Sequence, residues 1–329
     1  MTTRILVGDC RSILRTLPDR SVHCCVTSPP YFGLRDYGVD GQIGLEATPS
    51  AFVKEMVAVF REVRRVLRDD GTLWLNLGDS YNGQGARSPN IREDGSLSYR
   101  AGGQAIQVPG LKSKDLIGIP WRVAFALQAD GWYLRSDIIW SKPNPMPESV
   151  TDRPTKAHEY LFLLSKSARY FYDADAIREV ATVGDNGSSF TGERDLSVHP
   201  NRGMKRRSGN KARKPGTARG CPDGTGSNVC GSVPWEGEGR NKRSVWTVAT
   251  APFKEAHFAT FPPALIEDCI KAGCPKGGLV MDPFGGAGTT GLVADRLQRD
   301  ALLIELNPEY ALMARRRILG DATLLGEVA

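Results

Sequence analysis

A glycine-rich turn and a more distant carboxylate form the first group of residues with a chemical use. The apolar run Leu279–Asp282 leads into the turn Pro283–Gly288, and a helical pattern begins at Thr289. Glycines let the backbone approach a ligand closely, and a helix N-terminus offers free N–H groups. Glu305 ends the next apolar run, twenty residues beyond Gly285, where nucleotide-binding sheets place the carboxylate that accepts ribose hydroxyls. The spacing predicts a nucleotide-type ligand, and the missing lysine after the glycines disfavours a Walker phosphate loop.

A second group follows an early apolar run, Val22–Val26, and consists of the turn Thr27-Ser28-Pro29-Pro30-Tyr31. We expect this turn at the carboxyl edge of the sheet, where ligands bind. Two successive prolines fix the backbone and remove two N–H donors, which leaves carbonyl acceptors, the Ser28 hydroxyl and the face of Tyr31. These groups suit hydrogen bonds from an exocyclic amino group while Tyr31 stacks on the base that carries it.

The elements that must position these turns alternate between apolar runs and helical patterns, which is typical of a parallel sheet buried on both faces. We expect an amphipathic helix from an N-cap at Ser50 to Arg68, and an irregular loop over residues 82–112. The other expected strands cover residues 5–7, 72–77, 134–140 and 160–164, and the other expected helices begin near Pro120, Pro262 and Pro308.

The composition is that of a globular protein, with 329 residues, 40% hydrophobic and 24% charged. The net charge is +6, but residues 200–220 contribute eight Lys or Arg and no acid, so the remainder carries 6 − 8 = −2. This segment lies in an aperiodic insertion, residues 182–243, between ordered parts at 1–181 and 244–329. Such a cluster indicates either a polyanionic partner or a solvated loop.

Other classes are disfavoured by composition. No apolar run approaches the ~20 residues that span a bilayer, and the first residues lack the apolar stretch of a signal peptide, so we expect a cytoplasmic protein without membrane contact. The seven cysteines show no C-x-x-C spacing, and no metal site is predicted.

With both turns in view, the sequence resembles the amino-directed DNA methyltransferases that use S-adenosylmethionine, in the group whose Pro-Pro-Tyr motif precedes the glycine motif. Segments 138–147, 158–163 and 257–262 also resemble recurrent segments of this family, in the same order. The resemblance implies a Rossmann-like α/β fold, mostly parallel with helices on both faces and circularly permuted, with adjacent termini. It places the insertion where this family carries target recognition.

The resemblance also assigns residues. Ser28, Pro29, Pro30 and Tyr31 would be catalytic. The methionine part of the cofactor would contact Asp282, Phe284, Gly285 and Gly288. Its ribose would contact Glu305, and its adenine would contact Asp9 and Cys10. Phe261 and Thr289 are further expected cofactor-binding residues. Double-stranded DNA, the expected partner, would contact Arg206, Arg207, Arg213, Lys214, Lys142 and Asn144. A homodimer is left open.

The expected reaction is methyl transfer to the amino group of a flipped base, whose amino hydrogens point toward Ser28 and the Pro29 carbonyl while the proton leaves to Ser28 or water. Carbon-5 methylation is disfavoured because the chain has no Pro-Cys pair. Serine at position 28 favours cytosine N4 over adenine N6 as the target, but the sequence leaves the choice of base open. Asn76 stands where relatives place an acid, so Asp79 is either its replacement or a loop residue. The alternatives are a methyltransferase acting on RNA or protein and a non-catalytic DNA-binding protein.

Overall fold

The fold comes from a computed structural model that describes residues 1–83, 85–91, 97–105, 107–180, 239–251, 260–321 and 327–328. The chain forms two compact units, one from residues 1–177 with 241–329 and one from residues 178–240. The second unit is described only at its ends, where Glu179 and Arg240 form an antiparallel bridge. The first unit carries everything that follows.

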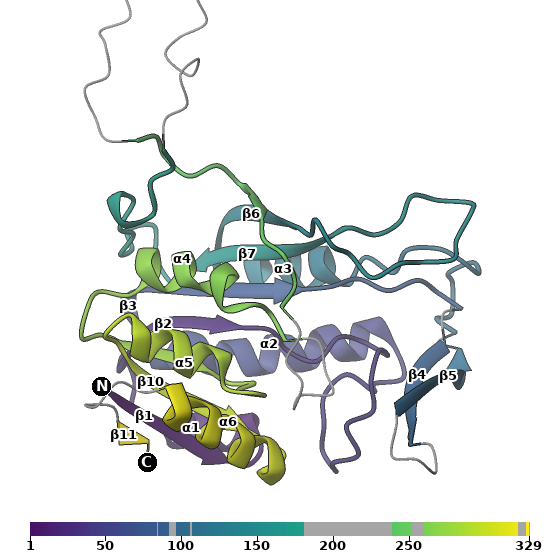
Figure 1. The fold of residues 1–329 in the computed structure, drawn as a ribbon, viewed down its shortest axis with the longest axis horizontal. Coiled ribbons are helices and arrows are strands. Elements are labelled where there is room, and N and C mark those ends of the chain that lie inside the picture. The colour runs from purple at the N-terminus through teal and green to yellow at the C-terminus, as the bar shows by residue number, and fades with distance from the viewer. Residues whose placement is uncertain are drawn as a thin grey trace, which may run out of the picture. The chain divides into compact units, whose positions relative to one another are not determined.

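A nine-stranded sheet forms the centre of the first unit, in the order β11-β1-β10-β9-β2-β3-β7-β6-β8 (Figure 1). Neighbouring strands from β11 to β3 are parallel, β7 runs antiparallel to both β3 and β6, and β8 is parallel to β6. The strands are β1 (Thr2–Val7), β2 (Val22–Thr27), β3 (Leu67–Leu77), β6 (Tyr133–Ser141), β7 (His158–Ser165), β8 (Val245–Thr247), β9 (Leu279–Asp282), β10 (Asp300–Glu305) and β11 (Glu327–Val328). The predicted mostly parallel sheet is confirmed.

The order of the strands explains how the fold is permuted. The glycine strand β9 lies in the middle of the sheet although it comes late in the chain, between β10 on one side and β2 on the other. The first strand, β1, pairs with β11 through Thr2↔Glu327, so the two ends of the chain lie side by side (Figure 1). A chain that began at β9 would build the same sheet with its ends elsewhere.

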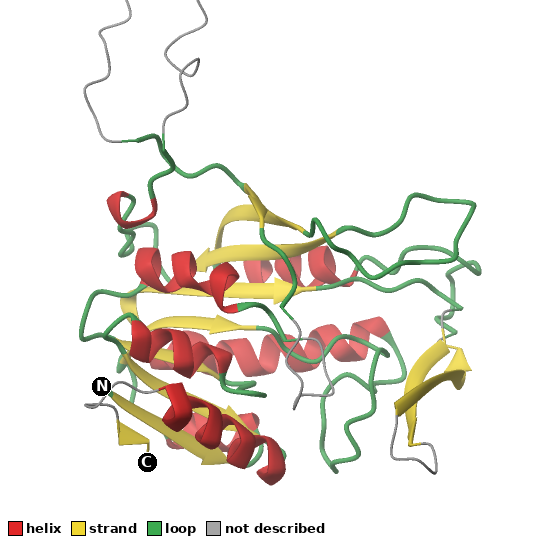
Figure 2. Cartoon of the chain, viewed as in Figure 1, coloured by secondary structure: helices red, strands yellow, loops and turns green. Residues whose placement is uncertain are grey.

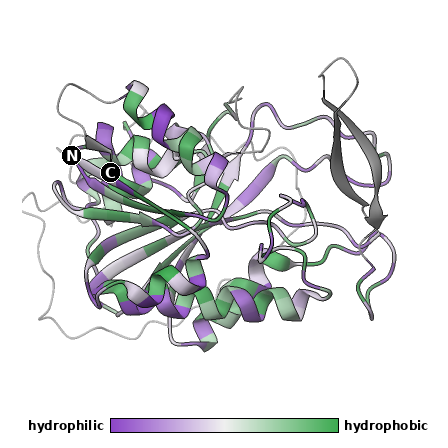
Figure 3. Cartoon of the chain, turned by 90° about the horizontal axis from the view of Figure 1, so that it is seen from below, coloured by the Kyte–Doolittle hydropathy of each residue, from purple (hydrophilic) through white to green (hydrophobic). Residues whose placement is uncertain are grey.

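Helices cover both faces of the sheet (Figures 2 and 3). On one face α1 (Cys10–Thr16), α2 (Pro49–Val66) and α3 (Ile119–Ala129) bury Leu14, Phe52, Met56, Val123 and Leu127. On the other face α4 (Pro263–Gly273), α5 (Thr289–Arg296) and α6 (Pro308–Asp321) bury Leu265, Ile266, Leu292, Val293 and Ile318. A short 3₁₀ turn, η1, covers Asp175–Ile177. The central strands β2, β9 and β10 are buried from both sides, as their continuous apolar runs predict.

Two local expectations were wrong. Helix α2 begins after Thr48, whose hydroxyl accepts the Ala51 N–H at 3.1 Å, and not after Ser50, because Pro49 already occupies the first helical turn. The expected irregular loop contains an antiparallel pair, β4 (Gly85–Ile91) and β5 (Leu97–Ala105), which forms its own two-stranded sheet. The Gly, Ser, Gln and Asn content of this segment indicated a loop, so the two strands were not expected.

Candidate active site

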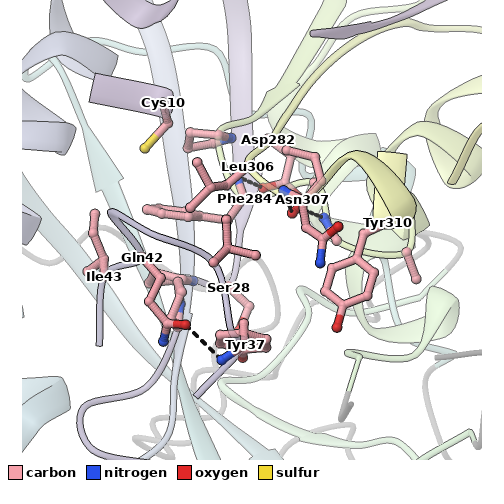
Figure 4. A pocket seen from close by; sticks show the side chains of 18 of the residues that line it. Cys10, Ser28, Tyr37, Gln42, Ile43, Asp282, Phe284, Leu306, Asn307 and Tyr310 are labelled. Carbon is pink, nitrogen blue, oxygen red and sulfur yellow. Dashed lines mark hydrogen bonds between the residues drawn. The ribbon is translucent and has the colours of Figure 1, made fainter. Parts of the chain in front are cut away.

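One pocket opens at the carboxyl ends of β1, β2, β9 and β10, where the two predicted turns meet (Figure 4). The space not filled by atoms is ≈ 1230 Å³, open mouth included. The predicted residues that line it are Asp9, Cys10, Ser28, Pro29, Pro30, Tyr31, Phe261, Asp282, Phe284, Gly285, Thr289 and Glu305. The pocket therefore brings together both groups of residues.

The glycine turn is shaped by close contacts. A Cβ on Gly285 would lie 3.1 Å from the Leu303 Cβ, and one on Gly288 only 2.8 Å from the Ala314 Cβ. Gly288 also has φ +73°, a left-handed conformation that favours glycine. Gly288 does not line the pocket, so in the structure it allows α5 to pack against α6.

Glu305 closes the turn from β10. Its Oε2 accepts the Gly286 N–H at 2.7 Å and its Oε1 accepts the Asn307 N–H at 2.8 Å. Burial raises the pKa of Glu305, and these two backbone bonds counter that rise. Each oxygen keeps a further lone pair, so the carboxylate can still accept hydroxyl groups from a ligand.

Asp282 joins the two turns. Its side chain is 2% exposed, and it accepts hydrogen bonds from the Thr27 hydroxyl at 2.6 Å, the Thr290 hydroxyl at 2.7 Å and the Phe284 N–H at 3.0 Å. Burial raises its pKa to about 6 despite these three bonds. Since Thr27 directly precedes Ser28, the carboxylate fixes the Pro-Pro turn against the glycine turn.

The loop after Tyr31 supplies pocket residues that sequence analysis missed. Tyr37, Gln42 and Ile43 line the pocket, and Gln42 Oε1 accepts the Tyr37 N–H at 2.7 Å (Figure 4). The loop is anchored by the Gly33 N–H to Gly44 O bond of 2.7 Å and by Arg11, which donates to Gly41 O. No local pattern marks these positions in the sequence.

The turn after β10 adds Leu306, Asn307 and Tyr310 on the other side (Figure 4). Leu306 and Asn307 follow Glu305 directly and Tyr310 lies five residues beyond it, so the strand-end position of Glu305 is a sequence feature that could have revealed them.

Tyr31 lies half-buried against Gly78, the residue that directly follows β3. A Cβ on Gly78 would come within 2.4 Å of its ring, and its hydroxyl lies 2.6 Å from Glu159 Oε2, 3.1 Å from Asn76 Oδ1 and 3.4 Å from Ser28 Oγ. Burial, and then the neighbouring carboxylate, raise the pKa of Tyr31 well above its usual value, so the hydroxyl stays protonated.

Asp79, which the sequence left open as a substitute acid or a loop residue, accepts the Gly118 and Ile119 N–H groups at 3.0 Å. It therefore caps α3, which identifies it as a structural residue.

The residues predicted to contact DNA are only partly described. Arg206, Arg207, Arg213 and Lys214 lie outside the described residues. Lys142 forms an ion pair with Glu159 and lies 4.2 Å from the centre of the Trp140 ring. Asn144 exchanges hydrogen bonds with the backbone of Thr250, at 2.9 and 3.3 Å. Contact of these two residues with DNA stays a prediction.

Comparison with known proteins agrees with this geometry. A family model described as DNA methylase matches residues 22–316. The Type II methyltransferase M.Cfr9I of Citrobacter freundii is 46% identical over 98% of this chain and 89% of its own length. Two solved structures share the fold. One is the cytosine-N4-specific PvuII DNA methyltransferase, with TM-score 0.59, 19% identity and coverage of 95% of this chain and 86% of its own. The other is a DNA modification methylase from Thermus thermophilus in complex with S-adenosylmethionine, with TM-score 0.54, 22% identity and coverage of 99% of both chains.

The fold and the pocket define a Rossmann-like methyltransferase, and the chain belongs to the DNA methylase family of amino-directed enzymes. It is a site-specific DNA methyltransferase, and S-adenosylmethionine is its cofactor. The pocket fits that group, because the glycine turn leaves room for backbone approach and the Asp282 and Glu305 side chains supply negative charge beside a cationic ligand. When bound, the cofactor supplies an electrophilic methyl group. In the described part of the chain, no helix is long and apolar enough to cross a membrane.

Proposed function

We propose that the target is the N4 amino group of cytosine. The observation that carries this proposal is the residue before the two prolines, which is the neutral Ser28 and not a carboxylate. The nearby acids are engaged elsewhere: Asp79 caps α3, Asp282 is bound by two threonines, and Glu159 pairs with Lys142. The amino group is therefore received by the Ser28 hydroxyl and the Pro29 carbonyl.

Hydrogen-bond donors beside the turn also favour cytosine. Beyond its amino group, the Watson–Crick edge of cytosine offers two acceptors, N3 and O2, whereas adenine offers only N1. Two ammonium groups lie next to the adjoining strands: Lys142 directly follows β6, and Lys156 lies two residues before β7. Each ammonium has three donors, more than its protein partners use. A site rich in donors matches the base with more acceptors.

In this proposal the residues of the turn orient the base and do not form a bond to it. The amino lone pair is delocalised into the ring, so orientation must compensate for poor nucleophilicity. Ser28 Oγ and the Pro29 carbonyl accept the two amino hydrogens, and Tyr31 supports the ring. The released proton passes to Ser28 or to water.

The product identifies the base. Duplex DNA methylated by the purified enzyme is digested to nucleosides, which are separated by chromatography and identified by mass spectrometry. N4-methylcytosine supports the proposal, and chromatography separates it from the isobaric 5-methylcytosine. N6-methyladenine would overturn it. RNA and a protein mixture serve as parallel substrates and should remain unmethylated.

We also propose that the basic insertion, residues 182–243, recognises the target sequence, and that the enzyme acts in the cytoplasm, where bacterial DNA lies. A homodimer remains a prediction that sedimentation of the free and DNA-bound enzyme decides.

A further inference from the structure

A group of polar side chains surrounds the Tyr31 hydroxyl behind the Ser-Pro-Pro-Tyr turn, and the established activity gives no role to its central member, Glu159. We call Tyr31, Asn76, Lys142 and Glu159 the Glu159 cluster. The residues come from the turn, the end of β3, the residue after β6 and the start of β7. In the β3–β7 register Leu77 pairs with Tyr160, so Glu159 falls opposite Gly78, the residue that the Tyr31 ring contacts.

Glu159 is the central member of the cluster. Its Oε2 lies 2.6 Å from the Tyr31 hydroxyl and 3.2 Å from the Asn76 amide nitrogen, and its Oε1 pairs with Lys142. The Glu159 and Lys142 side chains are 14% and 17% exposed. An O–H···O⁻ contact of 2.6 Å is in the range of charge-assisted hydrogen bonds, which are roughly twice as strong as neutral ones. Lys142 keeps this buried carboxylate compensated.

The ring of Tyr31 is therefore held at two points. The Gly78 backbone limits its approach to β3, because any side chain there would overlap the ring. Glu159 fixes the hydroxyl end and thereby the tilt of the ring. A stacking surface is useful only if its plane is fixed relative to the methyl donor, since a misplacement of ~1 Å can cost about 10²-fold in rate.

We propose that Glu159 is a positioning residue for methyl transfer, acting through the Tyr31 hydroxyl to fix the ring plane on which the target base stacks. It contacts neither the base nor the cofactor. Lys142 serves the same purpose one step further away, by forming an ion pair with the other oxygen of Glu159. The role is the same for cytosine and adenine, so it does not depend on the proposed base.

A double-mutant cycle on Tyr31→Phe and Glu159→Ala tests this, measured as the single-turnover methylation rate. Each single variant should lose roughly tenfold, and the double variant should lose no more than the worse single one, because both changes remove the same hydrogen bond. Independent effects would multiply to roughly a hundredfold and would overturn the proposal, as would an unchanged rate in Glu159→Ala.

Further measurements separate positioning from a general structural role. DNA and S-adenosylmethionine dissociation constants should stay within about twofold of wild type while the transfer rate falls. The reason is that the variants keep the contacts that bind both ligands and lose only an interaction that orients the base for the transition state. Glu159→Gln should be faster than Glu159→Ala, since the amide oxygen still accepts the Tyr31 hydroxyl. Equal rates for these two variants, or a matching loss of cofactor affinity, would contradict the proposal. Glu62→Gln is the matched control: Glu62 is 26% exposed and bonded to Arg65 at 2.8 Å on α2, and its replacement should leave the rate unchanged.

Discussion

Replacement of Glu305 by alanine tests the cofactor site most directly. The carboxylate is half-buried at the end of β10, and each oxygen accepts one backbone N–H, from Gly286 and Asn307. The remaining lone pairs are those that we expect to accept the two ribose hydroxyls of S-adenosylmethionine. No other carboxylate follows β10 directly, because the next residues are Leu306 and Asn307.

The size of the effect follows from these bonds. A hydrogen bond to a charged group contributes about 1.5–3 kcal/mol, so loss of two such bonds costs at least about 3 kcal/mol of binding free energy. Since about 1.4 kcal/mol corresponds to tenfold, the dissociation constant should rise roughly 100-fold or more. Folding should suffer less, because water entering the pocket can replace the acceptor for the Gly286 and Asn307 N–H groups. We expect a loss of about 1 kcal/mol, or roughly 2–4 °C in Tm.

Titration calorimetry with S-adenosylmethionine measures the affinity, and circular dichroism measures Tm. Glu309→Ala is the control, because Glu309 is an exposed acid four residues further on that does not line the pocket. It removes the same charge and should leave affinity within about twofold. An affinity of Glu305→Ala within about threefold of wild type, at unchanged Tm, would remove Glu305 from the ribose site.

Three further predictions concern pH, a helix cap and DNA. The pKa of Asp282 is raised from 3.8 to about 6, so the folded chain holds this proton more tightly than the unfolded chain; the stabilisation is complete below about pH 4 and is lost as pH rises through 6, up to about 3 kcal/mol. Urea unfolding at pH 4–7 should show this decline in wild type and a flatter profile in Asp282→Asn, and parallel profiles would refute it. Asp79→Ala should lower the free energy of unfolding by about 1–2 kcal/mol without changing the affinity for S-adenosylmethionine, and a stability equal to wild type would refute the cap. Replacing Arg206, Arg207, Arg213 and Lys214 by alanine should flatten the log–log salt dependence of DNA binding by about one unit per lost contact, and an unchanged slope would move recognition elsewhere.

Sequence analysis could predict the two turns because their features are local. A run of apolar residues that ends in Gly8-Asp9, in Ser28-Pro29-Pro30 or in Asp282-Pro283 marks the carboxyl end of a buried strand without any knowledge of pairing. The glycine turn is equally local, because its conformation requires that residue type at Gly288. These features were enough to place most of the predicted cofactor residues around one pocket.

The Glu159 cluster could not be predicted in the same way. Asn76 and Glu159 are 83 residues apart and meet only because β3 and β7 pair antiparallel, whereas the neighbouring strands on the other side of β3 are parallel. Sequence analysis left Asp79 open, as a substitute acid or as a loop residue, for a related reason. Its partners are the Gly118 and Ile119 N–H groups, nearly forty residues away, and no local pattern links a carboxylate to a helix that begins so far along the chain.

Asp282 shows why this site tolerates a permuted chain. Its carboxylate bonds to Thr27, 255 residues earlier, and the two segments meet because β2 pairs with β9 through Cys25↔Met281. The strand pairing therefore places the Pro-Pro-Tyr turn beside the glycine turn, and the buried carboxylate locks the spacing between them. Neither contact depends on which strand comes first in the chain. The ends of the chain lie at β1 and β11, away from these two strands, so the order of the motifs can change while the geometry for methyl transfer is retained.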